Sequence, residues 1–129
     1  ICDSSLILKF LKTEFSLPDE ALGEEGFSYK VMLEESFYFI LLYSRWVDSA
    51  GYNKIKTDFC DLFLPLYGHF FIGLIRKSLI RQANKQGIGR FLAEEVYSLG
   101  REQLQCMSDF LGEKKFMQGE RVSDIDFSF

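Results

Sequence analysis

Cysteine and proline are scarce in this chain of 129 residues, which has three cysteines and two prolines. The number of cysteines is odd, they are widely separated at Cys2, Cys60 and Cys106, and no pair has metal-binding spacing. This excludes the disulfide framework of a small secreted domain and gives no zinc motif. We expect reduced thiols with buried structural roles, and not reactive ones, in a compartment of the cytosolic type. Few prolines suit a chain of packed helices.

Excess positive charge is also lacking, because the formal net charge is −4. Such a chain offers no long-range attraction for polyphosphate, which argues against nucleic acid as a partner. Disorder is excluded by the high apolar content, since 47% of the residues are hydrophobic and 16% are aromatic. The length fits one domain with a real hydrophobic core.

Long uninterrupted apolar runs are absent. The most apolar stretch, residues 62–75, contains Pro65, Gly68 and His69 and is nearer the length of a buried helix than of a bilayer span. Membrane association would therefore have to be encoded elsewhere. Asp3 stands where a signal peptide would have basic residues. The first residue is not Met, so we expect further residues before it.

Helical periodicity dominates what is present. Residues 3–14 place their apolar side chains on one helical face, and the acidic, Gly- and Pro-containing residues 16–26 form a connector. Residues 27–49 predict a long helix that is apolar on more than one face and therefore buried in the middle of the domain. Gly51 and Asn53 predict its end.

Two further helices follow. Pro65 fits the first turn of one, residues 87–89 break the chain, and residues 91–111 form the next, with Gly112 as its C-terminal cap. No strand pattern is present beyond a turn near residues 116–117. The sequence thus predicts an all-α fold.

The sharpest local signal lies near the end. Ser123 stands at a helix N-cap with Asp126 three residues later, so each side chain can bond the other's backbone N–H. Val122 and Phe127 occupy the positions of a hydrophobic staple. The sequence stops about one turn into this helix, and one turn has no stability alone. We therefore expect the chain to be cut inside its fold.

These segments carry a family resemblance. Residues 110–119 (Phe-Leu-Gly-Glu-Lys-Lys-Phe-Met-Gln-Gly) followed by the capping segment 122–126 resemble the helical C-terminal domain of glutathione transferases. Residues 86–91 (Gln-Gly-Ile-Gly-Arg-Phe) and 94–97, with Tyr38 and Trp46-Val47-Asp48, resemble the failed axon connections group. That group includes cadmium-responsive proteins and is related to the metaxins.

The resemblance implies an organisation and a ligand. Residues 1–17 would be the remnant of a thioredoxin-like N-terminal domain, and residues 18–129 a truncated helical domain of the transferase C-terminal type. Ser4, with Asp3 beside it, matches the segment that holds glutathione at a helix N-terminus. Ser4 is otherwise a simple N-cap. The thiol-activating residue of a transferase lies in strands that precede this segment, so no catalytic residue is assigned.

Other candidate residues have two interpretations each. Tyr38, Tyr43, Arg45 and Trp46 line a cleft for a hydrophobic co-substrate, or they serve core packing. Arg76, Lys77 and Arg81 form a basic strip that is a solvated face, or that meets an anionic lipid or acidic partner. One larger set of phenylalanines is expected in the core: Phe37, Phe39, Phe63, Phe70 and Phe71.

A few positions carry no site. His69, the only histidine, is expected to be a packed residue, and no metal site is assigned. Leu92 stands where relatives have the N-cap serine of the helix that follows, which predicts a weakened helix start.

Two functions remain open. The first is a non-catalytic or poorly characterised glutathione-transferase relative that binds glutathione or a protein partner in axon development, metal stress or organelle biology. The alternative is an active transferase that conjugates glutathione to electrophiles. A homodimer and a cytoplasmic or organelle-associated location are compatible with both.

Overall fold

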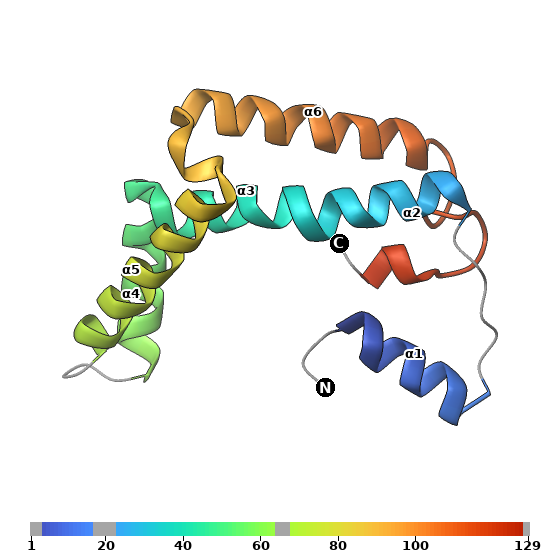
Figure 1. Cartoon of the computed structure of the whole chain (residues 1–129), viewed down its shortest axis with the longest axis horizontal. Helices are drawn as coiled ribbons and strands as arrows, with labels where there is room; N and C mark the ends of the chain where they lie inside the picture. Colours follow the sequence, from blue (N-terminus) through green and yellow to red (C-terminus); the bar gives the residue numbers. More distant parts are fainter. Residues whose placement is uncertain (1–3, 17–22, 64–67, 128–129) are drawn as a thin grey trace.

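The computed structural model describes residues 4–16, 23–63 and 68–127. Helices make up most of these residues, and the only strand-like pairing among them is an isolated bridge between Phe116 and Gly119 (Figure 1). This confirms the all-α fold. The elements in chain order are α1 (Ser4–Glu14), α2 (Glu24–Val31), η1 (Met32–Phe37), α3 (Tyr38–Leu42), η2 (Tyr43–Val47), α4 (Ser49–Phe63), α5 (Gly68–Gln86), η3 (Ile88–Arg90), α6 (Ala93–Leu111) and η4 (Asp124–Phe127).

Elements α2, η1, α3 and η2 form one continuous rod. The residues at their junctions, Val31, Phe37 and Leu42, all keep the right-handed helical conformation. Two stretches of the rod, η1 and η2, have π-helical hydrogen bonding. The long helix predicted over residues 27–49 is therefore present, and at two places its hydrogen bonds span five residues instead of four.

The predicted end of this helix is wrong in position and in cause. Backbone at Asp48 turns extended, with φ −60° and ψ 132°. Its carboxylate accepts the N–H of Ala50 at 3.1 Å, which makes Asp48 the N-cap of α4. Gly51 lies inside α4, where an added Cβ would stand 1.8 Å from the carbonyl oxygen of Ser44. Glycine is needed there for close approach of two helices and not as a stop.

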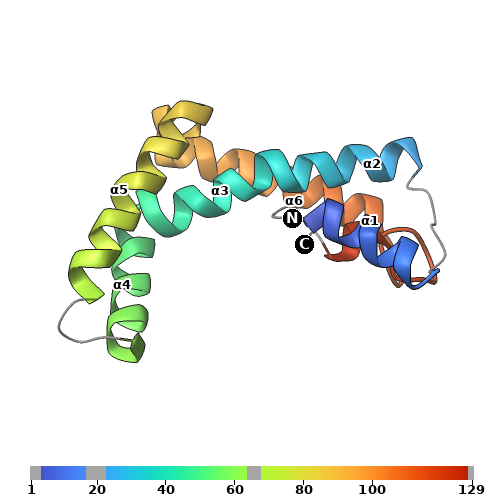
Figure 2. The ribbon, with the colours of Figure 1, turned by 60° about the horizontal axis from the view of Figure 1, so that its bottom comes forward.

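Three helical units surround the rod. Helix α6 runs antiparallel to it along one side, and α4 with α5 forms a helical hairpin that projects from its far end (Figures 1 and 2). At the other end, η4 returns to α2. Lys12 of α1 bonds Asp124 of η4 at 2.8 Å, which ties α1 to this end. Within the described residues no helix is long and apolar enough to cross a membrane.

Two buried clusters form the core, and the rod contributes to both. The first contains Ile40, Leu42, Tyr43, Ala83, Ile88 and Val96. The second contains Leu33, Met107, Met117 and Ile125. The expectation that the rod is central is thus confirmed, although its outer face leaves Phe27 and Tyr38 exposed.

The prediction that a set of phenylalanines lies in the core is right for some of them and wrong for others. Phe37 and Phe39 pack against the buried clusters as expected. Phe70 and Phe71 do not, since 67% and 57% of their surfaces are exposed. The side chain of Phe63 lies outside the described residues. Both exposed rings stand in the first turn of α5, where Phe70 lies opposite the buried Ile72 and Phe71 lies on the flank between them. Cys106, which was expected to be buried, is also exposed because it lies on the outer face of α6.

Candidate binding site at the end of helix α6

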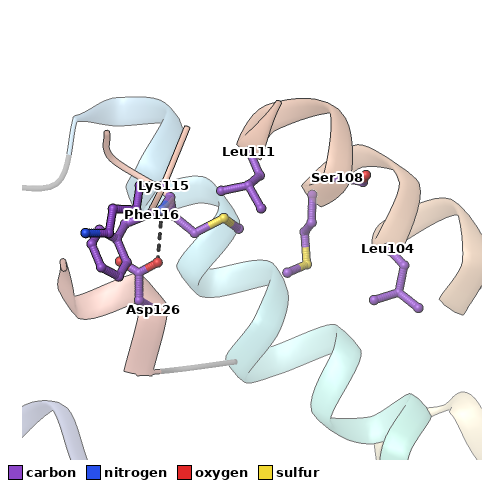
Figure 3. Close-up of a pocket in the computed structure, with 8 residues that line it drawn as sticks. Leu104, Ser108, Leu111, Lys115, Phe116 and Asp126 are labelled. Carbon is purple, nitrogen blue, oxygen red and sulfur yellow. Dashed lines mark hydrogen bonds between the residues drawn. The ribbon is translucent and has the colours of Figure 1, made fainter. Parts of the chain in front are cut away.

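A pocket of about 400 Å³ opens where the last turns of α6 meet the C-terminal turn (Figure 3). That volume lies within the range of small-molecule sites. Its lining is mostly apolar, with three polar side chains among the eight. The lining residues are Leu104, Met107, Ser108, Leu111, Lys115, Phe116, Met117 and Asp126.

Backbone geometry after α6 builds one wall of the pocket. The helix ends at Gly112, whose φ is +52°, as the predicted cap requires a residue that tolerates positive φ. The chain then reverses in a tight turn, where Phe116 and Gly119 exchange two N–H···O bonds of 2.9 Å. This turn confirms the one expected near residues 116–117 and presents Phe116 and Met117 to the pocket.

Asp126 fastens this turn to the final helical turn. Its carboxylate accepts the N–H of Met117 at 2.9 Å, and the N–H and hydroxyl of Ser123 at 2.8 Å each. Burial would raise the pKa of Asp126, but these hydrogen bonds together hold it below its ordinary value. Asp126 is therefore a carboxylate at neutral pH, and most of its accepting capacity is used inside the protein.

The expected reciprocal capping box forms only in half. Asp126 accepts from the Ser123 N–H as predicted, but the Ser123 hydroxyl donates to the carboxylate instead of accepting the N–H of Asp126. That N–H bonds the Ser123 carbonyl at 3.1 Å, because η4 is a 3-10 turn with bonds three residues apart. Val122 is 47% exposed, and the side chain of its expected staple partner Phe127 lies outside the described residues.

The start of α6 shows a second half-box. Leu92 offers no side-chain cap, as predicted, but its backbone N–H donates to the carboxylate of Glu95 at 2.8 Å. Glu95 therefore compensates in part for the missing N-cap serine.

Chemically, the pocket offers an apolar floor with charge at its edge. The exposed ammonium of Lys115 lies 5.4 Å from the ring centre of Phe116, and Leu104 is 41% exposed. Such a site suits a small apolar molecule with a polar or anionic end. The sequence placed residues 110–119 in a family motif but gave no reason to join them to Leu104 and Met107, which precede them on α6.

A polar cluster stabilises the opposite end of the rod. The Tyr97 hydroxyl donates to Asp48 at 2.5 Å, which raises the pKa of Tyr97 to about 12 and lowers the pKa of Asp48. Arg76 donates to the carbonyls of Trp46 and Val47 at 2.9 and 3.2 Å. Arg76 is thus a half-buried helix cap and not part of the solvated basic strip that the sequence predicted.

The four cleft candidates lie in different surroundings. Tyr43 is buried in the first core cluster, and Trp46 packs against that cluster. Tyr38 and Arg45 are exposed. None of the four lines the pocket at α6. A role of these residues in a co-substrate cleft stays a prediction. It applies chiefly to Tyr38 and Arg45, because their side chains are exposed.

The predicted glutathione contacts lie at the edge of the described structure. Ser4 is the first described residue of α1, so its predicted place at the helix N-terminus stays a prediction. The side chain of Ser4 and all of Asp3 lie outside the described residues, as does the side chain of His69. In the described part of the chain, no group of three or more His, Cys, Asp and Glu side chains is arranged to hold a metal ion.

Comparison with known proteins connects the chain to two kinds of relative. It is 28% identical over 134 residues to an isoprene-epoxide–glutathione S-transferase from Rhodococcus sp. (strain AD45), covering 98% of this chain and 56% of the relative. It is 24% identical over 111 residues to metaxin-1 from Mus musculus, covering 81% of this chain and 35% of the relative. The human metaxin-1 is 23% identical over the same length, with 24% of it covered.

The chain therefore spans about half or less of the length of the curated relatives it matches. No family model matches it, and no solved structure matches it significantly. The resemblance to the failed axon connections group finds no counterpart among these relatives. The all-α fold and the two kinds of homologue together support a relationship of this chain to the glutathione transferases and the metaxins.

Proposed function

We propose that this chain is the helical part of a glutathione-transferase-like protein that acts by binding glutathione or a protein partner rather than by proven catalysis. The similarity to a glutathione transferase across 98% of the chain carries the proposal. We prefer binding because the chain resembles the failed axon connections group, which is known by phenotype and not by substrate. The similarity to metaxin-1 over 81% of the chain is compatible with that relationship. Development or metal stress, in the cytoplasm or at an organelle, is the corresponding setting.

Glutathione would bind at the N-terminus of α1. A helix start presents unpaired N–H donors and a partial positive charge, both of which favour the γ-glutamyl carboxylate. Ser4 is the first described residue of α1, and the family resemblance assigns it to the start of this helix. The pocket at the end of α6 would then hold an apolar ligand or a partner side chain, with Lys115 meeting its polar end.

Retention on immobilised glutathione tests the proposal. We expect the chain to be retained and eluted by free glutathione, and Ser4→Ala to weaken retention severalfold. Ser28→Ala is the matched control, because Ser28 is an exposed helical serine whose hydroxyl bonds only its own helix, at Glu24. Equal loss in both variants would contradict the assignment of Ser4. No retention of the parent chain would end the glutathione proposal.

A second candidate is an active transferase, because one relative is named for conjugating glutathione to an isoprene epoxide. In that reaction class the glutathione sulfur forms a bond to an epoxide carbon, the carbon–oxygen bond opens, and the oxygen takes up a proton. Loss of free thiol from a mixture of glutathione and an aliphatic epoxide would measure it. A rate that equals the rate without protein would exclude turnover by this chain.

A further inference from the structure

Helix α5 differs in charge from the rest of the molecule. Its sequence contains Arg76, Lys77, Arg81 and Lys85 and no acidic residue. The remainder of the chain has eleven lysines and arginines against nineteen acidic residues, a net charge of −8. Positive charge is therefore concentrated on one helix of an acidic protein.

The exposed face of α5 has an apolar end and a cationic end. Phe70, Phe71, Leu74 and Ile75 are 67%, 57%, 50% and 41% exposed. At about 100° per residue, Phe70, Leu74, Lys77, Arg81 and Lys85 fall within about 80° of one another, opposite the buried Ile72 and Ala83. Arg76 lies on the buried side, where it caps the rod. Phe70 and Leu74 therefore share this face with three cationic side chains, of which Arg81 donates to the Lys77 carbonyl of the same helix at 3.2 Å. The exposed Phe71 and Ile75 flank its apolar end, about 100° and 140° around the helix from Phe70.

Its place in the molecule makes this face accessible. The apolar end lies at the start of α5, at the free end of the hairpin that α4 and α5 form away from the rod (Figures 1 and 2). The two phenylalanine rings pack edge to face with centres 5.9 Å apart, so they form one apolar wedge. The described charged side chains of α4 are Lys54, Lys56 and Asp58, which do not reverse the local charge.

We propose that this face docks on an anionic lipid surface. Phe70, Phe71 and Leu74 would enter the interface, where apolar side chains of peripheral helices lie about 5–10 Å deep. Lys77 follows Phe70 by seven residues, a rise of about 10 Å, which brings Lys77 to the level of the lipid phosphates. Arg81 lies about 6 Å farther along the helix, but its side chain points back to the Lys77 carbonyl, which brings its charge toward the same level. Cations near such a surface each strengthen binding by about fivefold.

An overall negative charge does not prevent this docking. Charges farther from the surface than a Debye length, about 8–10 Å, are largely screened, so the local charge of α5 decides the interaction. The occupant is a membrane and not a single acidic protein because apolar and cationic side chains are separated along the helix, which matches the layers of a bilayer interface. The described helices do not span a bilayer, so the contact would be peripheral.

Flotation with lipid vesicles tests the proposal, independently of any glutathione binding. We expect the chain to float with vesicles of phosphatidylcholine containing about 30% phosphatidylserine, to bind pure phosphatidylcholine at least tenfold more weakly, and to dissociate as salt rises. Lys77→Gln with Arg81→Gln should weaken binding about 30-fold. The matched control, Arg90→Gln with Arg101→Gln, removes two exposed cations elsewhere and should leave binding nearly unchanged.

The apolar wedge has its own variant. Phe70→Ser with Phe71→Ser should weaken vesicle binding at least tenfold, whereas Phe91→Ser, at a site 53% exposed, should not. All substituted positions are exposed, so circular dichroism should show unchanged helix content. Absence of flotation by the parent chain, or equal losses in test and control variants, overturns the proposal. A parent dimer that the Phe70 and Phe71 changes dissociate, without vesicle binding, would assign the face to a second copy instead.

Discussion

Replacing Asp126 by alanine is expected to loosen the C-terminal turn and both walls of the pocket. Three donors converge on this one carboxylate: the N–H of Met117, and the N–H and hydroxyl of Ser123. The Ser123 residue is 6% exposed and Met117 also 6%. Their N–H groups would therefore lose a charged acceptor in a place that water reaches poorly.

The size of the effect follows from these contacts. A hydrogen bond to a charged group contributes about 1.5–3 kcal/mol, and a buried donor left without a partner costs about 1–3 kcal/mol. The three bonds share one acceptor and are not additive, so we expect a loss of about 2–4 kcal/mol in the free energy of unfolding. For a chain of this size, that lowers Tm by roughly 10 °C.

Urea unfolding followed by circular dichroism measures this loss. Asp109→Ala is the control, because Asp109 is an exposed carboxylate that accepts one side-chain bond from Gln105. It should cost less than about 0.5 kcal/mol. A cost at Asp126 of no more than the control's would refute the role given to this carboxylate.

The pH dependence supplies a second check. The pKa of Asp126 lies below 3.8 in the folded chain, so its contribution is complete above pH 3.8 and is lost as pH falls through the lowered value. The stability difference between the parent chain and Asp126→Ala should therefore be constant near neutral pH and shrink below about pH 4.

Alanine at two glycines should change the free energy of unfolding in opposite directions. Gly51→Ala forces a Cβ to 1.8 Å from the Ser44 carbonyl oxygen and should lower it by at least about 2 kcal/mol. At Gly73 an added Cβ meets no atom within 4 Å, so Gly73→Ala should raise it by about 0.5–1 kcal/mol. Equal effects in urea unfolding would contradict the close helix approach at Gly51. Tyr97→Phe should cost about 1.5–2 kcal/mol near neutral pH through its lost bond to Asp48. The advantage of the parent chain should persist up to pH 10 and vanish as pH rises through about 12, because ionisation of Tyr97 is suppressed in the fold. An absorbance titration of Tyr97 with a midpoint near 10 would contradict the bond to Asp48.

Local signals in the sequence predicted the helices and the C-terminal turn well. The helix over residues 91–111, its end at Gly112 and the turn near residue 116 are all present. These features depend on side chains and glycines within a few residues of each other, so periodicity and turn chemistry suffice to find them.

Features set by distant contacts were not predictable in this way. A glycine at position 51 is typical of a helix end, but its proximity to a carbonyl seven residues earlier explains the glycine better. Arg76 has the pattern of a solvated cation, yet two carbonyls some thirty residues earlier hold it. Phe70 and Phe71 are large apolar residues of the kind that a core contains, yet both are exposed. Only the three-dimensional path of the chain decides such cases.

The pocket was missed for the same reason. Its lining combines α6 with the C-terminal turn, and the link between them is the bond from the Met117 N–H to Asp126. Spacing alone predicts a local capping partner for Asp126 at Ser123, and the structure confirms this in part. Spacing gave no indication of the second partner.

The most direct test of the whole account is a methyl NOE measurement on the isotopically labelled chain. Ile125 is fully buried and lies in one cluster with Leu33 of the rod and Met107 of α6. We predict cross-peaks that connect the Ile125 methyl groups to that cluster, and helical chemical shifts from residue 24 to residue 47. An Ile125 side chain without such cross-peaks, or an extended backbone around residue 125, would contradict the transferase-like fold on which the functional proposals rest.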